Sequence, residues 1–404
     1  MLACVKDYRQ GALRSGVDAT DISAGKVARA LILLGVAGLP LKDSDVLPGC
    51  GDLTVFDVRA RGFTFGQALS HILSPEDPSQ PTSVNQPNTP SQVDRLRPGW
   101  AAMPGFQLLN LPLVFVYAFD VIAINEESGG TSPVELAYRI YRNSLAPLLF
   151  VDTMSSVGLE KITFAHLAVR IAVAKAWASS RPVPVRVPAY HVLGTDLPDW
   201  LERAEFEATD AALPMPAPSA AVQDWSVDNP TSDIRLQGHD VLYKVQTTPG
   251  SAPFLLLSAA QKASFDIMMS LQPTVGRRIV VLIDCAFTSD STKFVSNLSN
   301  CKDLPSKIGQ LEQNQFFQGA VLVPCLVTNR PATLASRMSY VSNKVVLVAS
   351  NRLDHFFSPT LAPLIRSLGR GACCHTDLFI AVGLCYYVLC VAYPPRSYLE
   401  GFQT

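Results

Sequence analysis

The stretch "VVLIDCAFTSDSTK", residues 280–293, decides how the second half of this chain is interpreted. Apolar residues run into Asp284, a mixed Cys-Ala-Phe follows, and a polar run ends at Lys293. A buried strand that brings a carboxylate to an open sheet edge has this pattern. Asp284 is therefore either a functional acid or a residue that ends the strand, with a carboxylate that accepts hydrogen bonds from backbone amides of the "TSDST" turn.

Strand-like and helix-like segments alternate on both sides of this stretch. Alternation of this kind predicts an α/β fold in which helices pack over a sheet, and it argues against an all-β shell. We expect residues 232–370 to form one compact α/β unit with Val280 to Ile283 in a central strand. The expected strands cover 240–248, 277–287, 320–330 and 343–353, and the expected helices cover 254–271, 303–317, 332–340 and 358–368.

The first half of the chain is expected to be mainly helical. Ser23 opens a helix-like segment over 23–41, and Ser132 begins a capping box that has a proline at the first helical position. Residues 111–125 are a β-rich apolar run. Another helix is predicted over 158–179, with His166 on its apolar face. We expect His166 to be a hydrogen-bonded core residue, because no second His or acid stands four residues away to form a metal pair.

Two proline-rich, polar segments divide the sequence. The longer one, 74–99, contains six prolines and is expected to be a surface loop with little regular structure. The predicted organisation is a helical segment over 1–73, a linker over 74–99, a helical or α/β region over 100–212, a second linker over 213–231, the α/β domain over 232–370 and an apolar tail over 371–404.

Composition limits the classes of partner. The 404 residues include 33 Lys and Arg against 34 Asp and Glu, so no general basic field attracts nucleic acid or an anionic membrane, and any nucleic-acid contact has to be local. Nine cysteines without a Cys-x-x-Cys pair fit reduced thiols, and the start of the chain lacks the apolar core of a signal peptide. An intracellular location, in the cytoplasm or nucleus, is expected.

The apolar run at 378–393 is the one segment that raises the question of a membrane. It is shorter than the roughly 20 residues that a spanning helix needs. We favour burial in the core over a tail anchor, so a membrane partner is not expected.

Common catalytic motifs do not occur in this sequence. It has no Walker phosphate loop, no Gly-x-Ser-x-Gly elbow and no His-Glu-x-x-His. The acid at the end of the 277–287 strand remains. Carboxylates at strand ends, with a lysine and polar helix residues nearby, hold Mg²⁺ and an attacking water in metal-dependent phosphodiesterases.

With an acid at the end of a buried strand, the segment 225–370 resembles the restriction-endonuclease-like superfamily, which is known by its PD-(D/E)XK pattern. It is similar in particular to the divergent nuclease-like domains at the C-termini of Crinkler effectors and retrotransposon-hot-spot proteins. "HDVLYKVQTT" is similar to the strand of the first acid, "VVLIDCAF" to the strand of the second, and "SKIGQLEQN" to the helix that carries a Lys or Gln.

The resemblance implies a site in which Asp240 and Asp284 bind Mg²⁺ and act on nucleic acid. Ala286 stands two residues after Asp284, where the pattern has its lysine. The resemblance implies that Lys293 or Lys307 takes the place of this lysine, with Gln310 on the same helix as Lys307. If the acids do not converge beside it, this face of the helix 303–317 is expected to be solvated. An apparent helix also separates the two acids, where the family has a hairpin. These departures predict a degenerate domain, and we expect an inactive enzyme in preference to an active Mg²⁺-dependent nuclease.

Three classes of function stay open at this point. The first is the nuclease-like domain, and the second is a structural or assembly protein such as a viral capsid or virion subunit, in which self-assembly or a protein partner would cover the surface. The third is a Rossmann-like binding module. A mixed sheet with an antiparallel pair around Asp284 favours the nuclease fold, and a wholly parallel sheet favours the Rossmann fold.

Overall fold

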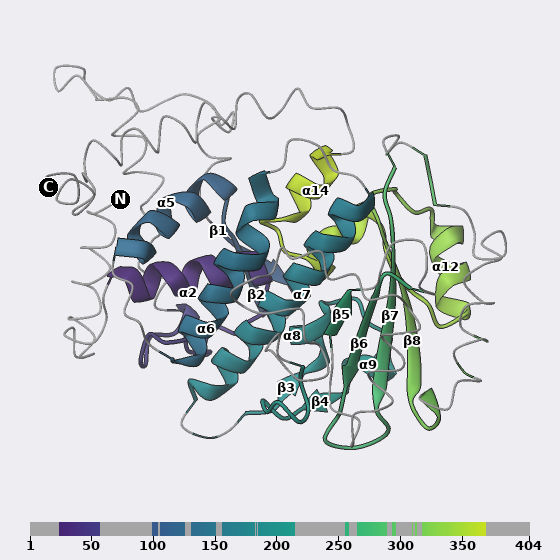
Figure 1. Ribbon diagram of the computed structural model, residues 1–404, viewed down its shortest axis with the longest axis horizontal. Helices are drawn as coiled ribbons and strands as arrows, with labels where there is room; N and C mark the ends of the chain where they lie inside the picture. The colour runs from purple at the N-terminus through teal and green to yellow at the C-terminus, as the bar shows by residue number, and fades with distance from the viewer. Residues whose placement is uncertain are drawn as a thin grey trace, which may run out of the picture.

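The computed structural model describes about half of the chain, and the elements below belong to that part. It covers residues 24–56, 99–103, 106–125, 131–150, 156–181, 185–214, 255–257, 265–288, 293–295 and 317–368, with residues 183, 309 and 312 as single positions. Helices lie on one side of the molecule and a sheet lies on the other (Figure 1).

The helical side is built around the long helix α7, Ser156–Ser179. Helices α2 (Ala24–Ala37) and α6 (Pro133–Ile140) pack against α7, and α5 (Leu113–Asn125) packs against α2. A π-helical turn η2, Tyr141–Leu145, and a 3₁₀ turn η3, Ala146–Phe150, follow α6 directly. The shorter elements of this side are β1 (Gly99–Met103), β2 (Phe106–Asn110), β3 (Val187–Pro188), α8 (Ala189–Leu193), α9 (Asp199–Glu202) and β4 (Glu205–Phe206).

The sheet side is a mixed five-stranded sheet in the order β5-β6-β7-β8-β9. Its strands are β5 (Leu255–Leu257), β6 (Ile267–Leu271), β7 (Ile279–Ala286), β8 (Val321–Thr328) and β9 (Val346–Val348). The pairs β5–β6 and β6–β7 are antiparallel, whereas β7–β8 and β8–β9 are parallel. The general α/β class and the central position of Val280 to Ile283 are therefore confirmed.

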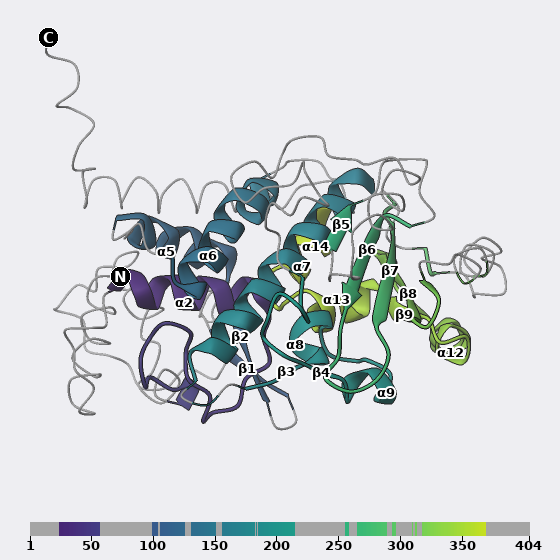
Figure 2. The same cartoon turned by 60° about the horizontal axis from the view of Figure 1, so that its bottom comes forward.

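Helix α12, Leu334–Ser342, connects β8 and β9 and lies on the face of the sheet opposite α7 (Figures 1 and 2). The chain then passes through η6 (Ser350–Arg352), α13 (Leu353–Phe356) and α14 (Ala362–Leu368). Helix α14 lies back on the helical side in both views. The predicted elements at 320–330, 332–340, 343–353 and 358–368 each contain the expected strand or helix.

The run at 111–125 is a helix, so the prediction of a β-rich segment there was wrong. The run is apolar almost throughout, and such a run has neither the alternation of a half-buried strand nor the stripe of a surface helix. Its length favours a helix, and α5 buries Phe115, Val116, Phe119 and Ala123 in the core.

The segment 254–271 contains two strands, so the predicted helix there was also wrong. Its apolar ends form β5 and β6, which pair with Leu255 opposite Met269. The spacing of its apolar residues suits one helix face, but neighbouring strands offer each apolar end full burial on the sheet. Helix propensity is a weak prior that tertiary packing overrides in this way.

Two of the predicted helix boundaries agree with the structure. Ser132 accepts a hydrogen bond from the Glu135 amide at 3.3 Å, with Pro133 in the first turn of α6. The Glu135 carboxylate forms an ion pair with buried Arg29 of α2, so it ties two helices together. Helix α2 ends at Ala37 and is followed by Gly38, whose φ of 62° and close approach to the Phe357 carbonyl suit glycine alone.

The sheet buries a different kind of core on each face. Ile283 and Cys285 point into the large core shared with α7, whereas Val280 and Leu282 point into a small core with Tyr340 of α12. The large core runs without interruption from α2 to the sheet. The domain boundaries expected from composition stay a prediction. The linker predicted over 74–99 lies outside the described residues except for Gly99, which begins β1, and the tail at 371–404 lies outside them entirely.

Arg170, in the middle of α7, is the most connected side chain of the large core. It is fully buried and donates hydrogen bonds to the carbonyl oxygens of Gly38, Tyr190, His191, Phe356 and Phe357, at 2.6 to 3.1 Å. These acceptors belong to the end of α2, to α8 and to the end of α13. A single guanidinium therefore holds three distant segments against α7.

Two buried histidines lie beside Arg170. His166 Nε2 lies 3.2 Å from the Phe356 carbonyl, and His191 Nε2 lies 2.8 Å from the Pro40 carbonyl. Burial, with Arg170 as a neighbour, lowers the pKa of each imidazole to about 3. Both are therefore neutral near pH 7, and the prediction that His166 is a hydrogen-bonded core residue is confirmed.

Candidate functional site

The candidate site lies where β7 ends, because Asp284 occupies the sixth position of that strand. Ile283 and Cys285 face the α7 side, so strand alternation places Asp284 on the opposite face, with Leu282. Asp284 is half-buried and its register partner on β8 is Leu326. The next residue on the same face, Ala286, is exposed.

A second carboxylate, Asp266, meets β7 at the same point. Asp266 directly precedes β6, and its amide donates to the Ile283 carbonyl at 3.0 Å. Its carboxylate accepts a hydrogen bond from the Cys285 amide at 2.6 Å. Asp266 is thus attached to the residues immediately before and after Asp284, and β6 and β7 bring two acids to one end of the sheet.

A third acid comes from α7. Glu160 is buried, and Thr163, one turn later, lies with its hydroxyl 3.7 Å from the Cys285 sulfur. Burial raises the pKa of the Cys285 thiol well above its usual value, and the charges of Asp266 and Glu160 add to this effect. Glu160 and Asp266 therefore both lie within electrostatic range of Cys285, and the thiol stays protonated.

The electrostatic influence of Asp284 extends to the neighbouring strand. Burial raises the pKa of Cys325 on β8 to about 12, with the Asp284 charge as the second cause. A raised pKa keeps a thiol protonated and poorly reactive. Cys50, Cys285 and Cys325, the cysteines that the structure describes, are all buried thiols.

The segment after β7 is fixed by an amide side chain. Asn329, just after β8, donates to the Thr288 carbonyl at 2.7 Å and accepts from the Thr288 amide at 3.0 Å. The ends of the two parallel strands are thereby joined. Lys293 follows in an exposed segment, and the amide of Val295 donates to the Pro331 carbonyl ahead of α12.

The structure places only part of the predicted site. Asp284 lies at the expected strand end and Lys293 lies beyond it, toward α12. Asp240, Lys307 and Gln310 fall outside the described residues, so their place in the site stays a prediction. In the parts of the chain that the structure describes, no group of three or more His, Cys, Asp or Glu side chains is arranged to hold a metal ion.

Asp266 and Glu160 were not predicted from the sequence. Asp266 lay inside the segment assigned to a helix, which concealed its position at the start of a strand. A signal was present, because the apolar runs of β6 and β7 are separated by a short polar stretch with Pro273 and Gly276, as in a hairpin. Glu160 had no comparable signal, since its role depends on how α7 packs on the sheet.

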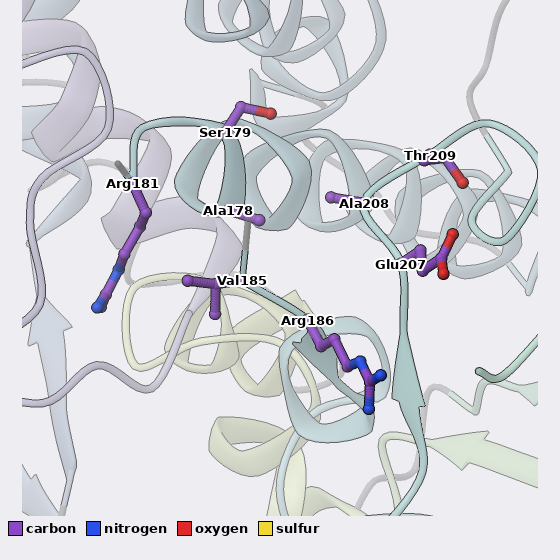
Figure 3. Close-up of a pocket in the computed structure, with 8 residues that line it drawn as sticks. All are labelled: Ala178, Ser179, Arg181, Val185, Arg186, Glu207, Ala208 and Thr209. Carbon is purple, nitrogen blue, oxygen red and sulfur yellow. The ribbon is translucent and has the colours of Figure 1, made fainter. Parts of the chain in front are cut away.

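A hollow of about 400 Å³ lies at the other end of α7 (Figure 3). Ala178 lies 18 residues after Glu160, which corresponds to roughly 27 Å along the helix. Arg186 and Glu207 both line the hollow, while Arg181 is paired with Asp45. Arg186 also lies 3.5 Å from Glu205. This hollow is therefore separate from the acids and carries charges of both signs.

The described helices include none that is long and apolar enough to cross a membrane. Comparisons of this chain with protein-family models, with curated proteins and with solved structures found no match.

Proposed function

We propose that this protein carries a divergent nuclease-like domain of the PD-(D/E)XK type, which binds a nucleic-acid phosphate through Mg²⁺ and cleaves it poorly. The observation that carries the proposal is that the Asp266 carboxylate accepts a hydrogen bond from the amide of Cys285, the residue next to Asp284, at the end of the antiparallel pair β6–β7. A mixed sheet with such a pair favours this interpretation over a Rossmann-like module, which has a parallel sheet.

Asp266 replaces Asp240 as the first acid in this proposal. It directly precedes β6, the strand paired with that of Asp284, so a hairpin joins the two acids, which removes one departure from the family pattern. Glu160 of α7 lies near Cys285, on the face opposite Asp284, and is not one of the proposed metal ligands. Mg²⁺ usually binds one or two protein carboxylates and completes its octahedron with waters and substrate phosphate oxygens. Two acids are thus enough for a site that fills only when nucleic acid is present.

Cleavage needs a further group that orients and activates the attacking water. The residue at that place in the pattern is Ala286, which is exposed and shares a face of β7 with Asp284. An alanine offers neither a charge nor a proton acceptor. The expected chemistry is therefore metal-assisted binding of a phosphodiester with a slow hydrolytic step.

Restoring the lysine tests this directly. Wild-type protein and the variant Ala286→Lys would be incubated with labelled single- and double-stranded DNA and RNA, with Mg²⁺ or with chelator. We expect little cleavage by the wild type and at least a tenfold gain for Ala286→Lys. The control Ala286→Gln, which is similar in length but uncharged, should show no gain.

Two results would contradict the proposal. Robust Mg²⁺-dependent cleavage by the wild type, abolished by Asp284→Ala in a folded protein, would show an active enzyme in place of a degenerate one. Absence of metal-dependent nucleic-acid binding in both the wild type and Ala286→Lys would reject the nuclease-like site altogether.

A further inference from the structure

Helix α12 carries an apolar stripe on the side that points away from the sheet. Leu334, Met338 and Val341 are 73%, 61% and 67% exposed. They stand at positions i, i+4 and i+7, so they share one face of the helix. Figure 2 shows α12 at the outer edge of the molecule. These three residues are called the α12 stripe below.

The orientation of the stripe is fixed by the opposite face of the helix. Tyr340 is fully buried against the sheet, and the Ser336 hydroxyl donates to the Val295 carbonyl at 2.8 Å. Thr333 caps the helix by accepting from the Ser336 amide. Because the inner face is anchored at Ser336 and Tyr340, α12 cannot turn the stripe inward without breaking these contacts.

The segment of the chain that carries the stripe is basic. Residues 313–353 contain no Asp or Glu and contain Arg330, Arg337, Lys344 and Arg352, although the chain as a whole has a net charge of −1. Arg337 lies within α12 beside Met338, and exposed Lys344 follows the end of the helix. An apolar stripe with positive flanks attracts an anionic partner that also has an apolar face.

We propose that the α12 stripe is a docking surface for an acidic amphipathic helix of another protein. An amphipathic helix presents apolar side chains at the same i, i+4, i+7 spacing, so it can pack along the stripe while its acidic flanks meet Arg337 and Lys344. The surface goes beyond the nuclease-like function, because it uses none of the acids at the end of β7.

Two other occupants fit the surface less well. A second copy of this chain would bring its own Arg337 and Lys344 against the same residues in a two-fold interface, and like charges there repel. Single-stranded nucleic acid binds on aromatic platforms. The three residues of the α12 stripe are not aromatic. Phe294 is an exposed aromatic residue, but it precedes Val295 in the chain and is not part of α12.

The test uses the full chain and three synthetic helical peptides. All three have the same leucine stripe, and their flanking positions carry Glu, Gln or Lys. Fluorescence anisotropy would give the dissociation constant of each peptide at low and moderate salt. We expect the Glu peptide to bind at least tenfold more tightly than the Lys peptide, with an affinity that falls as salt rises.

Variants on one helix assign the binding to the stripe. Met338→Gln should weaken the Glu peptide at least fivefold, whereas Ala335→Gln, at an exposed position of α12 outside the stripe, should leave it unchanged. Arg337→Glu should reduce the preference for the Glu peptide. Circular dichroism and thermal melting would show that each variant is folded.

Several outcomes would overturn the proposal. One is equal binding, or no binding, of the Glu and Lys peptides. A second is a dimer in sedimentation experiments that Met338→Gln dissociates, which would assign the stripe to a second copy. A third is binding of single-stranded DNA that Arg337→Glu abolishes while the peptides do not bind.

Discussion

The two faces of the central sheet are stabilised in different ways. The face covered by α7 belongs to a large core that includes Arg170, whose guanidinium is satisfied by backbone carbonyls from three segments. The face covered by α12 has a small core around Tyr340, and its helix leaves an apolar stripe exposed. The buried charge of Arg170 specifies one arrangement of the segments packed on α7. The small core around Tyr340 leaves the α12 stripe exposed, where we propose that a partner binds.

The candidate site lies at the boundary between these two faces. Asp284 is on the α12 face, while Glu160 and Cys285 are on the α7 face, and Asp266 contacts the strand between them. The α7 face can therefore hold Glu160 and Cys285 in place, and the α12 face, where Ala286 is exposed, leaves access for a ligand. Changes on the α7 face should alter folding, and changes on the α12 face should alter binding.

The largest effect is expected from Arg170→Met. The change removes five hydrogen bonds and leaves buried carbonyl oxygens without a donor, each at a cost of about 1 to 3 kcal/mol. We expect a loss of at least about 3 kcal/mol in the free energy of unfolding, measured with urea. Arg337→Met on α12 is the matched control and should change this free energy by less than about 0.5 kcal/mol. Similar losses in both variants would remove the contrast between the faces.

Acid should destabilise the α7 face next. The pKa of His166 and of His191 is about 3 in the folded protein, below the ordinary value of 6.5. The unfolded chain therefore binds more protons between these values, and the stability present above pH 6.5 is lost as pH falls toward 3. Each histidine contributes a slope of up to about 1.4 kcal/mol per pH unit.

Urea unfolding between pH 7 and pH 5 measures this slope before most carboxylates titrate. The variant His191→Gln should show a shallower slope than the wild type. An unchanged slope in that variant would indicate that other groups control the acid response.

A smaller effect is expected where the acids meet β7. Asp266→Ala removes the acceptor of the Cys285 amide and should cost about 1 to 2 kcal/mol. Asp266→Asn keeps an oxygen that can accept this bond, so its cost should be smaller. Equal losses for the two variants would mean that the charge of Asp266, and not its hydrogen bond, stabilises the strand end.

The smallest effect is expected on the α12 stripe. Met338 is mostly exposed, so Met338→Gln should change the free energy of unfolding by less than about 0.5 kcal/mol. Thermal melting would check this value. A clear loss of stability would show that the stripe is packed against the protein itself, contrary to its proposed role in docking.

Much of the sheet could be predicted from the sequence, because β7, β8 and α12 each carry a distinct local pattern. The β-branched run of β7 and the Thr333 cap of α12 act within a few residues. The helix α5 was missed, since a uniformly apolar run gives no period. The pair β5–β6 was missed because the spacing of its apolar residues suits a helix face and the burial of its strands depends on distant segments. Asp284 was found through its strand, whereas Asp266 required the correct hairpin and Glu160 required the packing of α7.

Metal binding by Asp266 and Asp284 tests the central claim most directly. Electron paramagnetic resonance of Mn²⁺, as a substitute for Mg²⁺, would be recorded with and without a single-stranded DNA oligonucleotide. We predict one weak site that tightens when the oligonucleotide is present, and at least tenfold weaker binding in Asp284→Asn and in Asp266→Asn, both of them folded. Mn²⁺ binding that is absent, or that persists unchanged in both variants, would contradict the account.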